Sequence, residues 1–135
     1  MPVKDKKRVI LDSNFLMLPF QFNVDVSNEI ERILGGGHKI YVPKEVLNEL
    51  NYLSIKAEKL SDRKLAKMAI EYAKRFNTIE GGGKDADGAI IALAEKDTIV
   101  CTNDKALKSR LRKFHVPIIY LRQKNKLEIE GYGVS

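Results

Sequence analysis

The acidic residues Asp12 and Asp104 each follow a short apolar run, at the point where a buried strand would end. Residues 9–11 precede Asp12 directly, and residues 98–101 precede Asp104 with a short polar pair between them. In open α/β sheets, ligands bind at the carboxyl ends of the strands. We therefore expect both carboxylates to face one crevice. Each acid has a competing interpretation as the N-cap of the helix that follows it.

Three further acids stand at helix positions that the same edge of a sheet can reach. Glu49 lies between Leu47 and Leu50, at the boundary of the buried face of its predicted helix, although it can equally pair with lysines in solvent. Asp85 and Asp87 open an almost wholly apolar helix, and residues two apart cannot share a helical face. We interpret Asp85 as the N-cap and Asp87 as the inward group, whose desolvation requires capping, pairing or a metal ion.

Several carboxylates that converge repel one another and need cations to remain ionised. A site whose coordinating atoms are all oxygens favours Mg²⁺ or Mn²⁺ over Zn²⁺. No histidine–cysteine cluster competes, because His38 and His115 are far apart and Cys101 is the single cysteine. The glycine triplets lack the lysine of a phosphate-binding loop, and no Gly-x-Ser-x-Gly motif occurs. The sequence therefore predicts a carboxylate site for Mg²⁺ or Mn²⁺.

Predicted strands alternate with predicted helices, which indicates an α/β fold: a three-layer α/β/α sandwich with a mostly parallel sheet. We expect strands at residues 8–11, 38–42, 98–101, 117–121 and 127–129, the last of them at an edge. The length favours one domain over residues 1–135.

Local signals predict where the helices begin and end. Pro19 is expected to break any helix in the apolar segment after Asp12. Ser27 is expected to cap a short helix, and Ser61 or Asp62 to cap a longer one. Residues 81–83, three consecutive glycines, are expected to form a flexible break.

The formal net charge is +6, and basic residues without any intervening acid are concentrated between residues 105 and 126. Such a face beside an acidic focus suits a polyanion, although a solvated helix surface is the simpler explanation. Phe114 and Tyr120 are the aromatics in this stretch, and both fit a core better than a base-stacking surface. The predicted RNA-binding residues are Lys105, Lys108, Arg110, Arg112 and Lys113.

Composition also excludes several classes of protein. The longest apolar run has six residues, 89–94, too short to cross a membrane. One cysteine excludes an internal disulfide and indicates a reducing cytoplasm. No long exposed apolar stripe is evident that would identify an interface.

At these residues the chain resembles the PIN-domain nucleases, the family of VapC toxins and rRNA-processing endonucleases. The matching segments are LDSN at residues 11–14, VP and VLNEL within residues 42–50, DADGAII at residues 85–91 with Ala94, and TND at residues 102–104. They occur in this order over nearly the whole chain. Residues 108–120 look closest to the rRNA-processing branch.

The resemblance implies a sheet with strand order 3-2-1-4-5 and a metal-dependent endoribonuclease. It places Asp12, Glu49, Asp87 and Asp104 in the family's catalytic acidic quartet, and Ser13, Asn14 and Thr102 at its small polar positions. Asp12, Asp87 and Asp104 would hold the metal. Asp85 is an alternative or additional third acid.

The implied partners are RNA, an antitoxin or ribosome-assembly factors, and a second copy of the chain. An alternative is a non-catalytic PIN-fold module that binds RNA or a ribosome-assembly partner. A receiver-like phosphoacceptor domain fits less well, because Asp12 has no acidic neighbour in its loop.

Overall fold

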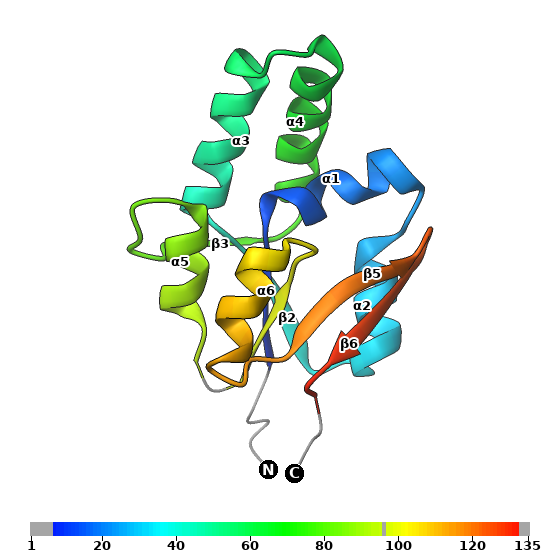
Figure 1. Cartoon of the computed structure of the whole chain (residues 1–135). Helices are drawn as coiled ribbons and strands as arrows, with labels where there is room; N and C mark the ends of the chain where they lie inside the picture. The colour runs from blue at the N-terminus through cyan, green and yellow to red at the C-terminus, as the bar shows by residue number, and fades with distance from the viewer. Residues whose placement is uncertain (1–6, 96, 133–135) are drawn as a thin grey trace.

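The computed structural model describes residues 7–95 and 97–132 and has a six-stranded sheet at its centre (Figure 1). Its strands are β1 (Lys7–Leu11), β2 (His38–Pro43), β3 (Asn77–Ile79), β4 (Thr98–Cys101), β5 (Ile118–Gln123) and β6 (Lys126–Glu130). Their order is β3-β2-β1-β4-β5-β6, and every neighbouring pair is parallel except β5 with β6. The predicted α/β class and the strand order 3-2-1-4-5 are confirmed. The last strand lies at an edge, as expected.

Helices cover both faces of the sheet and extend beyond one of its edges. They are α1 (Ser13–Phe22), α2 (Val26–Leu34), α3 (Lys44–Lys56), α4 (Leu60–Ala73), α5 (Ala86–Leu93) and α6 (Lys105–Arg112). α5 and α6 lie in front of the sheet and α2 behind it, while α3 and α4 form a hairpin that projects beside α1 (Figure 1). No helix within the described ranges is long and apolar enough to cross a membrane.

The two central strands explain where the polar residues collect. β1 and β4 are parallel neighbours, with Leu11 in register with Cys101. The last three residues of β1 and of β4 are at most 1% exposed, because helices cover both faces of the sheet at its centre. The chain therefore leaves both strands at the same edge, and Asp12 and Thr102 follow them side by side.

Two predictions about the N-terminal half are wrong. α1 runs through Pro19, although proline removes one helical hydrogen bond. Burial of Phe15, Leu16 and Leu18 on its inner side compensates for that loss. α2 begins after Asp25 rather than at Ser27, because the Asp25 carboxylate accepts a hydrogen bond from the Asn28 amide at 3.1 Å.

One further prediction fails at α4, and one strand that follows it was not predicted. This helix begins at Leu60 with Lys59 at its N-cap and has no side-chain cap, so neither Ser61 nor Asp62 caps it. The strand β3 was not predicted, because two of its three residues are exposed and they show no apolar alternation. It forms through its backbone, which pairs with β2 over Tyr41 to Pro43.

Candidate active site

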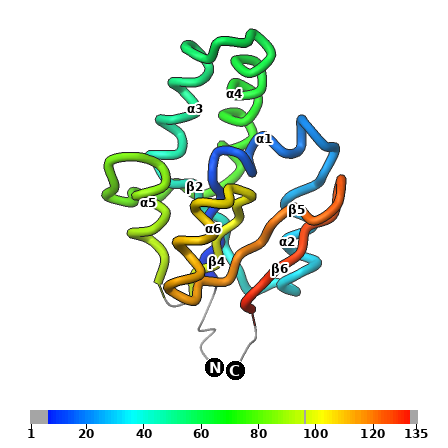
Figure 2. The backbone as a smooth tube through the Cα atoms, viewed as in Figure 1, coloured from blue at the N-terminus to red at the C-terminus, as the bar shows by residue number. Residues whose placement is uncertain are grey.

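All five predicted acids line one hollow of about 190 Å³ at the carboxyl edge of the sheet. The full lining is Asp12, Ser13, Asn14, Glu49, Asp85, Ala86, Asp87 and Asp104. These residues come from the turn after β1, from α3, from the start of α5 and from the turn after β4, four segments that can be followed in Figure 2. The strand ends and helix starts thus meet as the sequence suggested.

Asp12 is the most buried of these acids, at 5% exposure. Its Oδ1 accepts a hydrogen bond from the Phe15 amide at 2.8 Å, so it caps α1 while it lines the hollow. Burial raises the pKa of Asp12 to about 7. The hydrogen bonds from Thr102 and Phe15 act in the opposite direction, and the negative charges of Asp87 and Asp104 raise this pKa further. A cation would relieve the cost of ionising it.

Thr102 connects the two acids that follow the central strands. Its fully buried hydroxyl donates a short hydrogen bond to Oδ2 of Asp12 and accepts one from the Asp104 amide at 3.0 Å. Asp104 in turn caps α6 by accepting from the Leu107 amide at 2.9 Å. Each of these carboxylates therefore serves as a helix cap and also faces the hollow.

Glu49 reaches the hollow from α3, where Ser13 binds it. The Ser13 hydroxyl donates to Oε1 of Glu49 at 2.6 Å. Asn14 is exposed and lines the same hollow. Ser13 thus connects the turn after β1, which carries Asp12, to the acid of α3.

Asp85 and Asp87 take the different positions that their spacing predicts. Asp85 caps α5 by accepting from the Gly88 amide at 2.7 Å. Asp87 lies within the first turn of α5 and is half-buried. Burial raises its pKa, as do the charges of Asp104, Glu49 and Asp85, while Arg110 lowers it. Both acids line the hollow, so either can supply the third carboxylate.

The side chains around this hollow fit a hard divalent cation by their chemistry. The donors are carboxylate, hydroxyl and amide oxygens, and among the described residues no lysine or arginine lines the hollow beside the buried Asp12. Among the residues in the ranges 7–95 and 97–132, no three acidic, histidine or cysteine side chains are close enough to form a ready-made metal cluster. Mg²⁺ typically binds through one or two carboxylates with several waters and substrate phosphates, so it does not require such a cluster.

The predicted RNA-binding residues lie on and after α6, and they differ in solvent exposure and in whether another side chain already contacts their charge. Lys105, Arg110 and Lys113 are exposed. The Lys108 ammonium lies 4.8 Å from the centre of the Tyr120 ring. Arg112 is held by Glu130 through two hydrogen bonds of 2.8 and 3.0 Å. Arg112 is therefore the member of this set whose charge is already compensated.

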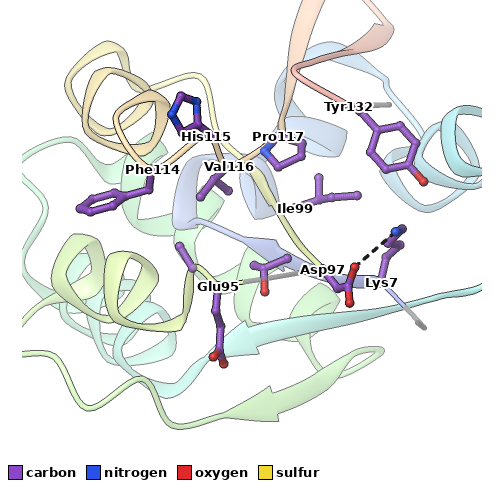
Figure 3. A pocket seen from close by; sticks show the side chains of 11 residues that line it. Lys7, Glu95, Asp97, Ile99, Phe114, His115, Val116, Pro117 and Tyr132 are labelled. Atoms are coloured by element: carbon purple, nitrogen blue, oxygen red, sulfur yellow. Dashed lines mark hydrogen bonds and ion pairs between the residues drawn. The ribbon is translucent and has the colours of Figure 1, made fainter. Parts of the chain in front are cut away.

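A larger hollow of about 490 Å³ lies at the opposite end of the sheet (Figure 3). Lys7 and Asp97 form an ion pair of 3.5 Å at one side of it, and none of the predicted catalytic residues lines it. Phe114 lines this hollow and is 60% exposed, so its prediction as a core residue is wrong. The helix ends before Phe114 and leaves the ring at the surface.

Several large apolar side chains are exposed at the surface, although the sequence shows no long apolar stripe. Large apolar side chains are exposed on α1, α3 and α4: Phe20, Phe22, Tyr52, Ile55, Leu60 and Met68. The sequence does not reveal that these side chains are exposed, because they are distributed over three different helices.

Glu45 is a residue whose connection to the site the sequence does not reveal. Its position near the start of α3 has a sufficient explanation in the helix dipole. In the structure its carboxylate accepts hydrogen bonds from the amides of Gly81 and Gly82, which precede α5. Residues 81–83 lie outside any helix or strand, as expected of a break, and these bonds tie the break to α3.

The fold and the hollow together define a class: an α/β domain with an acidic, oxygen-rich site at the carboxyl edge of a parallel sheet. A family described as a PIN-like domain matches residues 9–124. The chain therefore belongs to the PIN-like domain family, and the resemblance seen in the sequence is confirmed.

Individual relatives agree with this assignment over most of the chain. The chain is 32% identical over 127 residues to Ribonuclease VapC4 of Methanocaldococcus jannaschii, covering 92% of this chain and 97% of the relative. It is 25% identical over 122 residues to Ribonuclease VapC9 of Archaeoglobus fulgidus, covering 90% and 87%. Among solved structures, the PIN domain endonuclease Utp24 is similar with a TM-score of 0.77 and 27% identity, covering 96% of this chain and 95% of that chain.

Proposed function

We propose that this chain is a Mg²⁺- or Mn²⁺-dependent endoribonuclease. The observation that carries the proposal is the convergence of five acids on one hollow, with Asp12 buried and crowded by the charges of Asp87 and Asp104. The ribonuclease names of two archaeal PIN relatives and the similarity to an endonuclease structure support the same reaction class.

In this proposal Asp12, Asp87 and Asp104 hold the metal, with Asp85 as an additional ligand. A bound divalent cation supplies Lewis-acid activation of water and offsets charge on the leaving oxygen. Glu49, oriented by Ser13, positions the attacking water and accepts its proton. The hydrogen bonds of the Thr102 hydroxyl to Asp12 and to the Asp104 amide keep these two acids in place, and Asn14 lies at the same hollow as a contact for the substrate.

Metal dependence is tested with a long structured RNA in Mg²⁺, Mn²⁺ or EDTA. We expect internal cleavage with either metal and none in EDTA, because the crowded carboxylates cannot activate water without a cation. Gel analysis of RNA labelled at one end distinguishes internal cuts from stepwise trimming. RNA binding without cleavage under both metals would instead favour the non-catalytic RNA-binding or ribosome-assembly module.

The exposed cations on α6 and directly after it are proposed to hold the RNA backbone. Each phosphate contact made by a lysine or arginine contributes about 0.7 to the slope of log K against log salt for a single strand. We expect Lys105→Ala and Lys113→Ala each to reduce that slope by a similar amount. Arg112→Ala is expected to reduce it less, because Glu130 already compensates its charge.

The measurement is fluorescence anisotropy of a labelled RNA across a salt series, with EDTA present to prevent cleavage. Equal slopes for the wild type and the Lys105 and Lys113 variants would place the RNA on another face. An equally large effect of Arg112→Ala would show that its ion pair opens to bind phosphate.

Two cellular roles are proposed for this activity, both in the cytoplasm. The VapC names of the archaeal relatives favour a toxin that is restrained by a small antitoxin protein. An rRNA-processing enzyme that works with ribosome-assembly factors is the second role. The exposed apolar side chains of α1, α3 and α4 support a protein partner in either role, including a second copy of the chain.

A further inference from the structure

Glu45, in the first turn of α3, binds the glycine loop of residues 81–83 that precedes α5. Its Oε1 accepts from the Gly81 amide at 3.1 Å and its Oε2 from the Gly82 amide at 2.9 Å. Consecutive backbone amides in a turn form a concave site for an anion. Gly82 has a φ of +74°, a left-handed conformation that glycine adopts without strain. The carboxylate of Glu45 fills the anion site that this loop creates.

The same loop packs directly on the first turns of α5. A Cβ atom added at Gly81 or at Gly83 would lie 2.8 Å from the Cα of Ala89, which is closer than real Cβ atoms approach. The absence of side chains therefore lets the loop backbone lie against the helix backbone. The loop and the first turns of α5 are therefore in backbone contact, with no side chain of these glycines between them.

α5 in turn presents two of the site acids. Asp85 caps this helix through the Gly88 amide, and Asp87 lies in its first turn. The loop therefore packs against the same helix that carries these two carboxylates into the hollow. Glu49 enters the hollow from α3, one helical turn after Glu45. The helix α3 therefore supplies one site acid directly and contacts, through Glu45, the loop that packs on the helix of the other two.

We propose that Glu45 is a positioning residue of the active site, which binds the glycine loop so that α5 holds Asp85 and Asp87 in place for the metal. This inference rests on the proposed function, because it assigns the purpose of the contact to metal binding. Glu45 itself is not among the residues that line the hollow.

The charge state of Glu45 agrees with this role. Partial burial raises the pKa of its carboxyl group, but the amides of Glu45 itself and of glycines 81–83 act against it and hold the pKa below its ordinary value. The carboxylate is therefore ionised, and able to accept both hydrogen bonds, throughout the neutral range.

A purely structural role in α3 predicts something different. An acid in the first turn stabilises a helix through its charge alone. Loss of that effect would lower the stability of α3 without changing the affinity of the acids on α5 for metal. Metal affinity and the protection of the loop amides therefore distinguish the two roles.

The experiment compares Mn²⁺ binding by calorimetry in the wild type, Glu45→Ala and Glu45→Gln, with Glu58→Ala as the control. Glu58 is an exposed acid in the turn between α3 and α4. Amide hydrogen exchange of Gly81 and Gly82, measured by NMR, reports on the contact without depending on activity. Circular dichroism verifies that each variant is folded.

We expect Glu45→Ala to bind Mn²⁺ roughly tenfold more weakly, at the lower end of what loss of an indirect ligand support costs. The Gly81 and Gly82 amides should exchange faster in the same variant. Glu45→Gln should be intermediate in both measurements, because its amide offers one acceptor oxygen instead of two. Glu58→Ala should match the wild type.

Three results would overturn the inference. Wild-type affinity in Glu45→Ala, beside measurable Mn²⁺ binding by the wild type, would remove the positioning role and leave the nuclease proposal intact. Unchanged exchange of the Gly81 and Gly82 amides in Glu45→Ala would show that the Glu45 carboxylate does not hold the loop. No Mn²⁺ binding by the wild type would overturn the proposed function itself, and the inference with it.

Discussion

Replacing Asp12 by Asn is expected to abolish RNA cleavage and, at the same time, to stabilise the metal-free protein at pH 8. Cleavage should fall roughly a thousandfold or more, because the variant loses a charged metal ligand. The fold should survive, because Asn is a good N-cap and its side-chain oxygen can still accept from the Phe15 amide.

The gain in stability follows from the pKa of Asp12. Burial raises this pKa to about 7, from an ordinary value of 3.8 that applies to the unfolded chain. Between these values the folded state binds more protons than the unfolded state, so the free energy of unfolding falls as the pH rises from about 4 to 7. The asparagine side chain does not titrate, so this loss disappears in the variant. The expected gain at pH 8 is on the order of 2 kcal/mol or more.

The measurements are urea unfolding of both proteins in EDTA at pH 5 and pH 8, repeated with Mg²⁺. Mg²⁺ should stabilise the wild type and have little effect on Asp12→Asn, because a ligand stabilises only the protein that binds it. Asp62 is an exposed acid in the first turn of α4, and Asp62→Asn is the matched control. It should behave like the wild type both in its stability at pH 8 and in its stabilisation by Mg²⁺. Cleavage by Asp12→Asn near the wild-type rate would exclude Asp12 from the metal site. A variant less stable than the wild type at pH 8 in EDTA would show that the burial of Asp12 carries no electrostatic cost.

The positions of Asp12 and Asp104 could be predicted because the physical signals around them are strong. Each follows an apolar strand that is buried in the centre of the sheet, and parallel strands bring their carboxyl ends to one edge. The competing interpretation of these acids as helix caps is also correct. A cap at a strand-to-helix turn uses one carboxylate oxygen for the helix amide and keeps lone pairs free, so the two interpretations do not exclude each other.

The parts that could not be predicted depend on backbone pairing or on contacts between distant segments. β3 has three residues with little burial and forms because β2 offers free backbone groups. Glu45 and the loop of residues 81–83 are far apart in the sequence, and nothing in either segment indicates the other. Pro19 remains inside α1 because burial of the surrounding apolar residues outweighs one missing hydrogen bond. Local rules describe each segment, whereas these outcomes are determined by its neighbours in space.

Replacing Thr102 by Val should remove the hydroxyl that is hydrogen-bonded to both Asp12 and the Asp104 amide, while preserving the shape of the core. The hydroxyl of Thr102 is fully buried and lies between Oδ2 of Asp12 and the amide of Asp104. Valine has nearly the same volume but leaves both groups without this partner, which costs about 1–3 kcal/mol for an unsatisfied buried polar group. The Thr102 hydrogen bond also lowers the pKa of Asp12, so its loss should raise that pKa.

We therefore expect Thr102→Val to reduce cleavage by roughly 10- to 100-fold, the range typical for groups that orient metal ligands. The acid limb of its pH–rate profile should move to higher pH, because Asp12 must lose its proton to bind the metal. Thr102→Ser is the matched variant: it keeps the hydroxyl and loses one methyl group, at a cost in stability of about 1 kcal/mol. It should keep the wild-type profile and cleave within a few-fold of the wild type. Equal rates and superimposable pH profiles for the Val and Ser variants would show that Thr102 contributes only to core packing and not to the site. A shift confined to the Val variant can arise only from the hydroxyl that joins Asp12 to Asp104, since the missing methyl group belongs to the Ser variant alone.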